Sequence, residues 1–522
     1  MSLGSRLLEA SERRPEAAAL VEGDLRLDYA GLLERARRVA GGLAGLGVGP
    51  GDRVATALRN RVETVLLYWA SQWLGAWFVP LNWRLTPADV AYCVEDAGAS
   101  VLAVEEVSAG VATLVPAGCG LVAIGPGCPG TPFEQLTSAE PAPGPAPVDE
   151  GEPAIMLYTS GTTGRPKGVP RSHRAEWASA LAHVIQCRYV PGERTLGVMP
   201  LYHTMGMRSL LAMVAVDGCL VVQAAFRGSE ALEAVADERI SALYLAPTLF
   251  YDLLAAARQR PGGCPRVPRL AYAGAPMTAA LVEACRSAFD PEVFVNHYGS
   301  TEIYTFSIGP DQVAKPGCAG RPGIHERLRL VAPEPGADPS LPVPPGEVGQ
   351  VACHLSSPEA FTSYWHRPDA DARALRDGWY LTGDLGRLDE DGDLWVLGRV
   401  DDMIITGGEN VFPLEIEEVL ATYPGVEDVA VVGLPDDRLG EKVVAFVVGR
   451  GVDADGLEAH CLASPALAPF KRPREYHFLR QLPKNASGKL LRARLRELVS
   501  AEPAGPGKRG DHDRARRLPG GA

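Results

Sequence analysis

The pattern of hydrophobic and polar positions predicts a chain in which strands and helices alternate. Runs of consecutive apolar residues, such as 154–158 and 243–246, are typical of short strands buried on both faces of a sheet. Between such runs, apolar residues recur every three or four positions, as they do from Leu32 to Ala40 after the N-cap residue Asp28. This alternation favours an α/β fold with helices covering a largely parallel sheet.

The pattern changes twice along the chain. Residues 316–400 show short strands between Gly/Pro turns and predict an all-β subdomain, whereas a smaller α+β pattern begins after Arg399. A length of 522 residues suggests about three domains or subdomains. We therefore predict an N-terminal domain over 1–400 with two α/β sheet subdomains and a β subdomain, a small α+β C-terminal domain over 401–500, and a disordered tail over 501–522.

Charge and cysteine usage limit the function classes. The chain has 51 basic and 64 acidic residues and a formal net charge of −13, which argues against nucleic-acid or anionic-membrane partners. Its ten cysteines form no C-x-x-C pair, so neither a zinc site nor a disulfide framework is predicted. The N-terminus lacks the apolar region of a secretory signal, and the apolar stretch 65–74 is too short to span a bilayer. We expect a cytoplasmic protein.

The stretch Y-T-S-G-T-T-G-R-P-K-G at 158–168 follows a predicted strand and has the composition of an anion-binding loop. Its glycines allow a close backbone approach with free N–H donors, and its hydroxyls add donors that rotate. Lys167 adds a positive charge, but Gly168 follows it where the common nucleotide loop has Ser or Thr. The combination suits a polyphosphate, although a plain surface turn would share the composition. The contributing residues are Thr159, Ser160, Gly161, Thr162, Thr163, Gly164 and Lys167.

Two later motifs add acidic groups. The motif Y-G-S-T-E at 298–302 contains Glu302, and a carboxylate near a polyphosphate usually indicates Mg²⁺. The motif G-W-Y-L-T-G-D at 378–384 ends in Asp384, which is suited to accept hydrogen bonds from a ribose diol. Read separately, the first motif could be an ordinary strand-to-turn segment, and Asp384 could merely cap a turn.

Taken together and in this order, the motifs resemble the AMP-forming acyl-CoA synthetase superfamily, which also contains peptide-synthetase adenylation domains and luciferases. The resemblance extends from about residue 155 to residue 492. Its C-terminal part, G-R-V-D-D-M-I-I at 398–405, G-G-E-N at 407–410 and L-P-K-N at 482–485, looks most like benzoate and halobenzoate (aryl) CoA ligases.

The resemblance implies ATP, Mg²⁺ and coenzyme A as the small molecules bound. It makes Glu302 the metal contact and Thr301 a phosphate contact, and it places Arg399 beside Asp384 at the ribose. Lys489 would neutralise charge in the first half-reaction, when a carboxylate attacks the α-phosphorus. Further nucleotide-binding positions implied are Gly274, Ala275, Pro276, Asn296, His297, Tyr298, Gly299 and Ser300.

For the acid, the resemblance implies a mostly apolar pocket with no Asp to hold an α-amino group, so we expect a bulky aromatic or alicyclic carboxylic acid. His203 would line this pocket and not act as a base, because the attacking carboxylate is already ionised near neutral pH. The implied lining residues are His203, Thr204, Gly206, Met207, Ala273, Gly274, Gly299, Ile303 and Tyr304.

For the thioester step, the resemblance places Gly407, Gly408 and Glu409 along a tunnel for pantetheine. Arg84 and Arg472 resemble contacts to the CoA nucleotide. Asp401 matches a hinge about which the small C-terminal domain, mobile in this family, swings between the two half-reactions.

The predicted function is therefore an acid:CoA ligase that works through an acyl-adenylate. Three alternatives remain: an enzyme for one half-reaction only, an adenylation enzyme that loads an external carrier protein, and a non-catalytic nucleotide-binding regulator. The intact Glu302 and Lys489 weigh against the first and the third. The family also allows a homodimer.

Overall fold

The computed structural model describes residues 2–159, 165–334, 336–484, 490–500 and 515–517. Contacts divide the chain into two compact units. The first comprises Met1–Arg329, Ala352–Leu381 and Asp391–Leu394, and the second comprises Leu330–Val351, Thr382–Glu390 and Trp395–Ala522. The predicted boundary near Asp401 lies inside the second unit and stays a prediction.

The larger sheet of the first unit has nine strands in the order β16-β15-β14-β13-β12-β10-β11-β1-β2. Its centre is parallel, and antiparallel strands lie only toward its two edges, at β2 and at β15 and β16. The strands are β1 (Ala18–Glu22), β2 (Leu25–Asp28), β10 (Arg194–Gly197), β11 (Cys219–Val222), β12 (Ala242–Leu245), β13 (Arg269–Ala273), β14 (Val293–Tyr298), β15 (Ser307–Gly309) and β16 (Arg321–Pro322).

The other sheet of this unit has seven strands in the order β7-β6-β5-β3-β4-β8-β9. It is parallel except for β9, which returns antiparallel to β8 with Thr159 opposite Lys167. The predicted anion-binding loop therefore joins two neighbouring strands at one end of the sheet. The strands are β3 (Arg53–Ala57), β4 (Trp77–Pro80), β5 (Val101–Glu105), β6 (Gly120–Ile124), β7 (Thr131–Pro132), β8 (Pro153–Thr159) and β9 (Lys167–Ser172).

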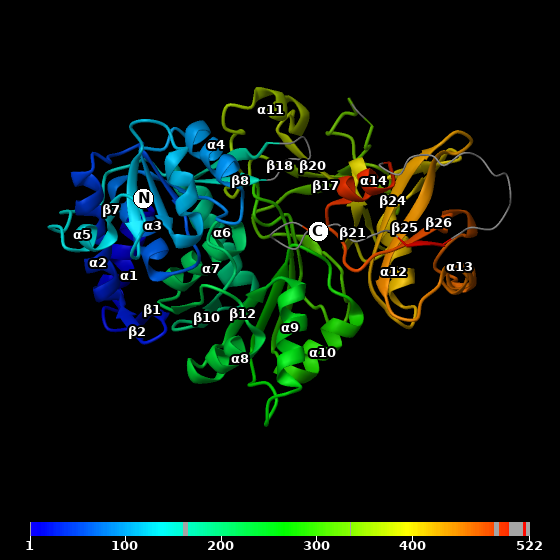
Figure 1. The fold of residues 1–522 in the computed structure, drawn as a ribbon, viewed down its shortest axis with the longest axis horizontal. Helices are drawn as coiled ribbons and strands as arrows, with labels where there is room; N and C mark the ends of the chain where they lie inside the picture. The colour runs from blue at the N-terminus through cyan, green and yellow to red at the C-terminus, as the bar shows by residue number, and fades with distance from the viewer. Residues whose placement is uncertain (1, 160–164, 335, 485–489, 501–514, 518–522) are drawn as a thin grey trace. The chain divides into compact units, whose positions relative to one another are not determined.

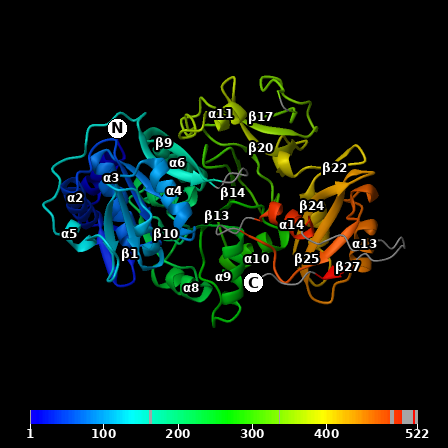
Figure 2. The same cartoon turned by 45° about the horizontal axis from the view of Figure 1, so that its top comes forward.

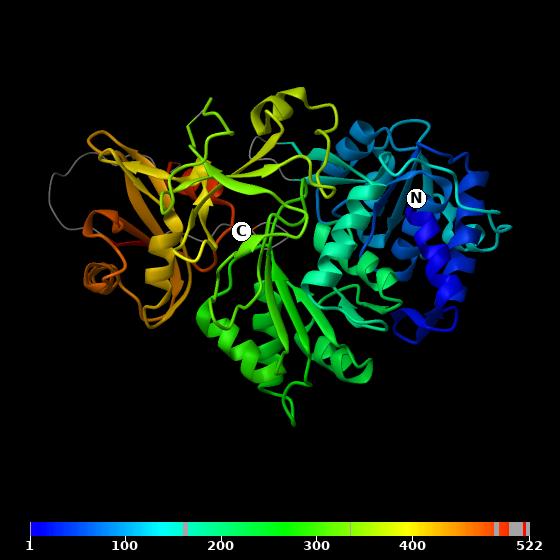
Figure 3. The same cartoon turned by 180° about the vertical axis from the view of Figure 1, so that it is seen from behind.

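Helices pack against both sheets (Figures 1 and 3), which confirms the predicted α/β class. The side chain of Asp28 accepts a hydrogen bond from the Gly31 amide at 2.7 Å and caps α2, as the sequence indicates. On one side of the larger sheet, α8, α9 and α10 lie next to one another. The helices are α1 (Leu3–Arg13), α2 (Tyr29–Gly45), α3 (Val62–Leu74), α4 (Pro87–Ala97), α5 (Phe133–Thr137), α6 (His173–Gln186), α7 (Thr204–Ala215), α8 (Gly228–Asp237), α9 (Pro247–Ala257) and α10 (Ala279–Phe289), with a 3₁₀ helix η1 (Glu106–Thr113).

The predicted all-β segment 316–400 needs a correction. It does form a five-stranded sheet of β17 (Leu328–Val331), β18 (Gly349–His354), β19 (Leu375–Arg376), β20 (Trp379–Leu388) and β21 (Leu394–Arg399), but it also contains the helix α11 (Pro368–Ala374). Pro368 stands at the first position of this helix, and Asp369 and Asp371 lie in its first turn. Both are helix-start signals that the strand-based interpretation of this segment overlooked.

After Arg399 the second unit forms an α+β fold, as predicted. Its sheet has the order β23-β22-β25-β26-β27, with β24 paired to β25. Figure 2 labels β22, β24, β25 and β27 of this sheet. Successive residues of β24 and β25 alternate between two hydrophobic clusters, one holding Val431 and Val443 and the other Ala430 and Val444, so both faces of this strand pair are buried. The elements are η2 (Val400–Asp402), β22 (Ile404–Thr406), β23 (Glu409–Val411), α12 (Pro413–Ala421), β24 (Val426–Asp436), β25 (Gly440–Gly449), α13 (Ala454–Ala463), η3 (Pro469–Lys471), β26 (Glu475–Phe478), α14 (Arg492–Ser500) and β27 (Ala515–Arg517).

The strand β27 differs from the predicted disorder of residues 501–522. Ala515 to Arg517 pairs in parallel with Tyr476 to Phe478 of β26, because the free edge of β26 offers unpaired backbone groups to another strand. The rest of the predicted tail lies outside the described residues. Among the described residues, no helix is both long and apolar enough to cross a bilayer.

Candidate active site

Three side chains of the first unit connect the predicted anion-binding loop to the predicted metal ligand. Lys167 is the first residue of β9, and its Nζ lies 4.1 Å from the centroid of the Tyr364 ring. The hydroxyl of Tyr364 donates a hydrogen bond of 2.5 Å to Oε1 of Glu302. Glu302 is only 7% exposed. The structure therefore places a lysine and a buried carboxylate around one tyrosine.

The electrostatics of this group follow from burial and from the neighbouring charges. Burial lowers the pKa of Lys167, and the negative charge of Glu302 partly opposes that shift. Burial and then the nearby Glu302 carboxylate raise the pKa of Tyr364, so its hydroxyl keeps the proton that it donates. A cation and a carboxylate held in this way can bind the phosphates of a nucleotide and its metal ion, respectively.

The loop that carries Glu302 is a tight turn at the end of β14. The Ser300 amide donates to the Ile303 carbonyl at 2.9 Å, and the Glu302 amide donates to Oγ of Ser300 at 3.2 Å. Gly299 must lack a side chain, because a Cβ there would lie 2.1 Å from the carbonyl oxygen of Tyr304. The turn therefore fixes the backbone that presents Thr301 and Glu302.

The predicted adenine-binding segments lie side by side at the carboxyl ends of two parallel strands. Ala273 at the end of β13 is opposite His297 of β14. Gly274 follows with φ +90°, and the space where its Cβ would stand is open. In open α/β sheets, ligands bind beyond the carboxyl ends of the strands, which supports this placement. The roles of Gly274, Ala275, Pro276, Tyr298 and Ser300 in nucleotide binding stay predictions.

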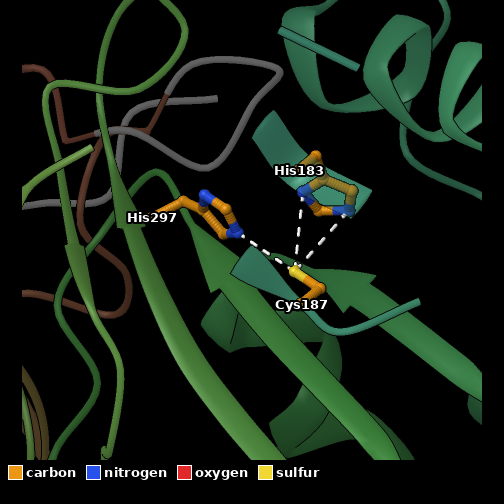
Figure 4. A group of neighbouring side chains, drawn as sticks. All are labelled: His183, Cys187 and His297. Atoms are coloured by element: carbon orange, nitrogen blue, oxygen red, sulfur yellow. Dashed lines mark hydrogen bonds between the residues drawn. The ribbon is translucent and has the colours of Figure 1, made fainter. Parts of the chain in front are cut away.

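Asn296 and His297 have protein partners in this structure. Nδ2 of Asn296 donates to the Cys318 carbonyl at 3.1 Å, so this side chain joins β14 to a neighbouring loop. Nε2 of His297 lies 3.2 Å from Sγ of Cys187, which also lies 3.6 Å from Nδ1 of His183 (Figure 4). All three members of this His–Cys–His group are buried.

The ligand atoms of the His–Cys–His group are close enough to hold a metal ion, but its surroundings do not suit one. An amine of the Arg208 guanidinium lies 3.3 Å from Nδ1 of His297. Arginine only donates, so Nδ1 is the acceptor and Nε2 carries the proton that points to Cys187. To bind a metal through Nε2, His297 would have to carry its proton on Nδ1. That proton would then face the buried Arg208 guanidinium, which is itself a donor. We interpret the group as a hydrogen-bonded part of the core.

The predicted acyl-pocket residues lie at the start of α7 and after β14. His203 is the N-cap of α7, and burial lowers its pKa to about 4. The imidazole is therefore neutral near pH 7, which agrees with a lining role. A Cβ on Gly206 would lie 2.2 Å from the Pro200 carbonyl oxygen, so this glycine allows the helix to approach the preceding loop. The buried residues Met207, Ile303 and Tyr304 contribute to the core, and an acyl pocket that includes them and Thr204 stays a prediction.

The two predicted ribose contacts meet in the second unit. Arg399 donates to Oδ1 of Asp384 at 2.7 Å. A Cβ on Gly383 would lie 2.8 Å from the Arg399 guanidinium, and Gly383 also has φ +74°, so glycine suits this position in two ways. The pair places a carboxylate and a cation together, as ribose binding would require.

The predicted CoA-step residues have clear local structures. Gly407 and Gly408 have φ +61° and +86° between the paired residues Thr406 and Glu409, so they form the two-residue turn of a hairpin that needs positive φ at both positions. Glu409 is exposed. Their contacts to CoA stay predictions, as does the hinge role of Asp401.

The two predicted CoA-binding arginines have partners within their own units. Arg84 of the first unit donates to the Tyr202 hydroxyl at 2.8 Å. Arg472 of the second unit bonds Glu458 at 3.1 Å.

Several predicted residues lie outside the described part of the chain: Ser160, Gly161, Thr162, Thr163, Gly164 and Lys489. Conversely, sequence reasoning missed Tyr364 and Arg171. Tyr364 lies far along the chain from Glu302, and Arg171 stands in an ordinary strand, so no local pattern marks either residue.

Comparison with known proteins shows the family of this chain. The model of the AMP-binding enzyme family matches residues 7–365, and that of the AMP-binding enzyme C-terminal domain matches residues 415–489. Feruloyl-CoA synthase of Amycolatopsis is 35% identical over 508 residues, covering 95% of this chain and 98% of that protein. 4-Chlorobenzoate–CoA ligase of Arthrobacter is 34% identical over 516 residues, covering 95% of each.

A solved structure is similar throughout its length. O-succinylbenzoate coenzyme A synthetase from Bacillus subtilis, in complex with ATP and magnesium ion, has a TM-score of 0.81 and 29% identity, covering 94% of this chain and 98% of that one. The family match spans well over half of the chain, and the two curated relatives align along nearly all of it. The chain is therefore an enzyme that belongs to the AMP-binding enzyme family, the superfamily of AMP-forming acyl-CoA synthetases that its motifs resemble.

Proposed function

We propose that this protein is an AMP-forming acid:CoA ligase that activates a bulky aromatic or alicyclic carboxylic acid. The observation that carries the proposal is the contact of Tyr364 with both Lys167 and Glu302, which joins a phosphate-binding cation to a metal-binding carboxylate. The names of the three relatives refer to feruloyl, chlorobenzoate and succinylbenzoate substrates, all aromatic, and they favour an aromatic acid here.

In the first half-reaction, an oxygen of the acid attacks the α-phosphorus of ATP, an acyl–phosphate bond forms, and pyrophosphate leaves. The acid is already ionised near neutral pH, so the protein needs no general base. Lys167 and the hydroxyls of the loop 159–164 would bind the phosphates, and Lys489 would neutralise the charge that develops on the α-phosphate. Asp384 and Arg399 would hold the ribose.

The residues present fit a magnesium ion. Glu302 offers carboxylate oxygen, the ligand type that Mg²⁺ prefers, in a nearly buried position fixed by Tyr364. Glu302 would hold the ion, and Thr301 would contact a phosphate. The ion, when bound, would reduce the negative charge of the polyphosphate.

In the second half-reaction, the CoA thiolate attacks the acyl carbon, a thioester bond forms, and AMP leaves. We propose that the C-terminal domain changes position about Asp401 between the two steps, with the hairpin of Gly407, Gly408 and Glu409 guiding pantetheine. Arg84 and Arg472 would bind the CoA nucleotide. His203, neutral near pH 7, would line the acyl pocket.

The test is ATP–pyrophosphate exchange with a panel of aromatic, alicyclic and fatty acids, run beside mass spectrometry of CoA thioesters. We expect exchange with aromatic or alicyclic acids and its loss in Lys489→Ala. The control is Lys484→Ala, which removes a half-exposed lysine five residues before Lys489 in the sequence. Lys484 pairs with Asp428, and its removal should leave exchange unchanged.

The same assays separate the alternatives. If the enzyme exchanges pyrophosphate but forms no CoA thioester, and instead transfers the acyl group to an added carrier protein, the acceptor would be the carrier protein and not CoA. Absence of exchange with every acid, together with thioester formation from synthetic acyl-adenylates, would overturn the complete-ligase proposal and leave an enzyme for the second half-reaction. Absence of both activities would leave a nucleotide-binding regulator.

A further inference from the structure

Arg171 of β9 is fully buried in the first unit, on the strand that begins with Lys167. Each nitrogen of its guanidinium has a partner. Nε bonds Oε1 of Glu176 at 2.5 Å, and one terminal amine donates to Oγ of Ser179 at 3.1 Å. Cζ of the guanidinium lies 3.7 Å from the centroid of the Tyr304 ring. A buried cation with this many partners holds a fixed position.

The other terminal amine of Arg171 contacts three backbone carbonyls at once. It lies 3.2 Å from the Thr301 oxygen, 3.1 Å from the Glu302 oxygen and 3.0 Å from the Glu359 oxygen. These carbonyls belong to two segments far apart in the sequence. The first carries the predicted phosphate and metal contacts, and the second leads toward Tyr364.

Two more backbone bonds tie the same segments together. The Phe361 amide donates to the Glu302 carbonyl at 2.9 Å, and the Trp365 amide donates to the Gly168 carbonyl at 2.9 Å. The segment that contains Tyr364 is therefore fixed on one side to the Glu302 loop and on the other to the strand of Lys167. Arg171 lies where the strand and both segments meet, since it belongs to β9 and bonds the other two.

The choice of arginine has a physical reason. A buried ion pair such as Arg171 and Glu176 seldom stabilises a fold more than apolar residues of similar size would, because both charges lose their hydration. The guanidinium nevertheless offers five donors in a rigid plane, and a lysine offers three on a flexible stem. The multiple bonds from Arg171 to loop carbonyls indicate a positioning task in addition to a contribution to stability.

We propose that Arg171 is the positioning residue of the metal- and phosphate-binding loop, holding the backbone of Thr301 and Glu302 at a fixed place relative to Lys167. This inference rests on the proposed function, because it takes Glu302 as the metal contact. Because Arg171 is fully buried and its guanidinium nitrogens bond other protein groups, its role would not require contact with the nucleotide. Arg171 acts through the carbonyls of the loop and through the segment that leads to Tyr364.

The test uses the full-length double variant Arg171→Met/Glu176→Leu, which removes both charges of the buried pair and keeps side chains of similar volume. Replacing both charges of a buried pair is often neutral for stability, whereas loss of the bonds to the loop carbonyls lowers it. We therefore expect a folded protein with a moderately lower melting temperature than that of the wild type. We expect binding of Mn²⁺ in the presence of ATP, measured by electron paramagnetic resonance without the acid, to weaken about 10- to 100-fold.

Steady-state kinetics give the second readout. The KM for MgATP should rise in parallel with the loss of Mn²⁺ affinity, whereas the KM for the acid should stay unchanged. The matched control is Arg174→Met, an exposed arginine at the start of α6, which should change neither quantity. Arg171→Lys keeps the charge opposite Glu176 and should show a smaller loss of Mn²⁺ affinity than the double variant.

The outcomes distinguish this inference from the proposed function. A folded double variant with wild-type Mn²⁺ affinity and KM for MgATP would assign Arg171 a purely structural role and overturn the inference. If the wild-type protein shows no pyrophosphate exchange with any acid of the panel, that result would instead contradict the proposed function, whatever the variant does. If the double variant does not fold, the same two measurements are made on Arg171→Lys. A Mn²⁺ affinity and a KM for MgATP that both equal those of the wild type would then overturn the inference.

Discussion

The Tyr364 hydroxyl bonds Oε1 of Glu302 at 2.5 Å, and the ring of the same tyrosine lies 4.1 Å from Nζ of Lys167. One aromatic side chain thus separates a cation from a carboxylate and orients both. Lys167 and Glu302 each contact Tyr364 and form no ion pair with each other. Each charge then remains available for a ligand of opposite charge.

Tyr364→Phe should keep the ring beside Lys167 and remove the bond to Glu302. A hydrogen bond to a charged group contributes about 1.5–3 kcal/mol, so we expect the KM for MgATP to rise about tenfold or more. Initial rates of pyrophosphate exchange at varied MgATP measure this. The control is Tyr251→Phe, an exposed tyrosine of α9, which should behave as wild type. An unchanged KM in Tyr364→Phe would show that Glu302 keeps its orientation without the hydroxyl.

Lys167→Ala should remove the cation of the proposed phosphate-binding loop. Loss of one charge that stabilises the transition state costs about 10²–10³ in rate, so we expect exchange to fall by about that factor. Lys167→Arg should retain part of the activity, since it keeps the charge and changes the shape of the group. Equal exchange rates in Lys167→Ala and wild type would exclude this lysine from the phosphate site.

The pair of Asp384 and Arg399 predicts how the enzyme treats the sugar. A site built to bond a hydroxyl discriminates strongly against an analogue that lacks it. Wild-type enzyme should therefore use ATP much better than 2′- or 3′-deoxy-ATP, as compared by kcat/KM for exchange. Asp384→Asn should weaken this preference, mainly because it lowers kcat/KM for ATP itself. If the preference for ATP stays the same in the variant, Asp384 does not hold the ribose.

Stability should depend on pH through His173 and His203. Burial lowers the pKa of each to about 4 from the ordinary 6.5, so below pH 6.5 the unfolded chain binds protons that the folded chain excludes. Their contribution to stability is therefore fully present above pH 6.5 and is lost as the pH falls toward 4. Urea unfolding between pH 7.5 and pH 5 should show this loss.

The pH effect must be isolated from that of Glu326, which works in the opposite direction. Burial raises the pKa of Glu326 to about 8, so this carboxyl favours the folded state more as the pH falls below 8. The difference in unfolding free energy between wild type and His203→Gln removes that common term. The difference should shrink as the pH falls from 7 to 5, and a difference independent of pH would contradict the buried neutral imidazole.

The sequence predicts those parts of this structure that depend on local pattern. Asp28 and the apolar spacing after it indicate α2. The strand β27 could not be predicted in this way, because it depends on the free edge of β26 and not on its own residues. The same holds for Tyr364 and Arg171, whose importance comes from contacts with Glu302, distant in the chain.

The order of the motifs identified the family, but it did not reveal how the site is held together. Glu302 could be proposed as a metal ligand from its motif alone. The hydrogen bonds that orient its carboxylate and its backbone come from Tyr364 and Arg171, which no motif contains. Functional residues that touch a ligand leave a local signature, whereas residues that support them must only fit the fold.

The central claim is that an acid oxygen bonds the α-phosphorus of ATP before the acyl group reaches CoA. The most direct measurement supplies the aromatic acid with ¹⁸O in its carboxylate and analyses AMP and acyl-CoA by mass spectrometry. The proposed mechanism predicts one ¹⁸O atom in each AMP released, with AMP and acyl-CoA formed in equal amounts. Unlabelled AMP, or ADP and phosphate as the nucleotide products, would contradict it.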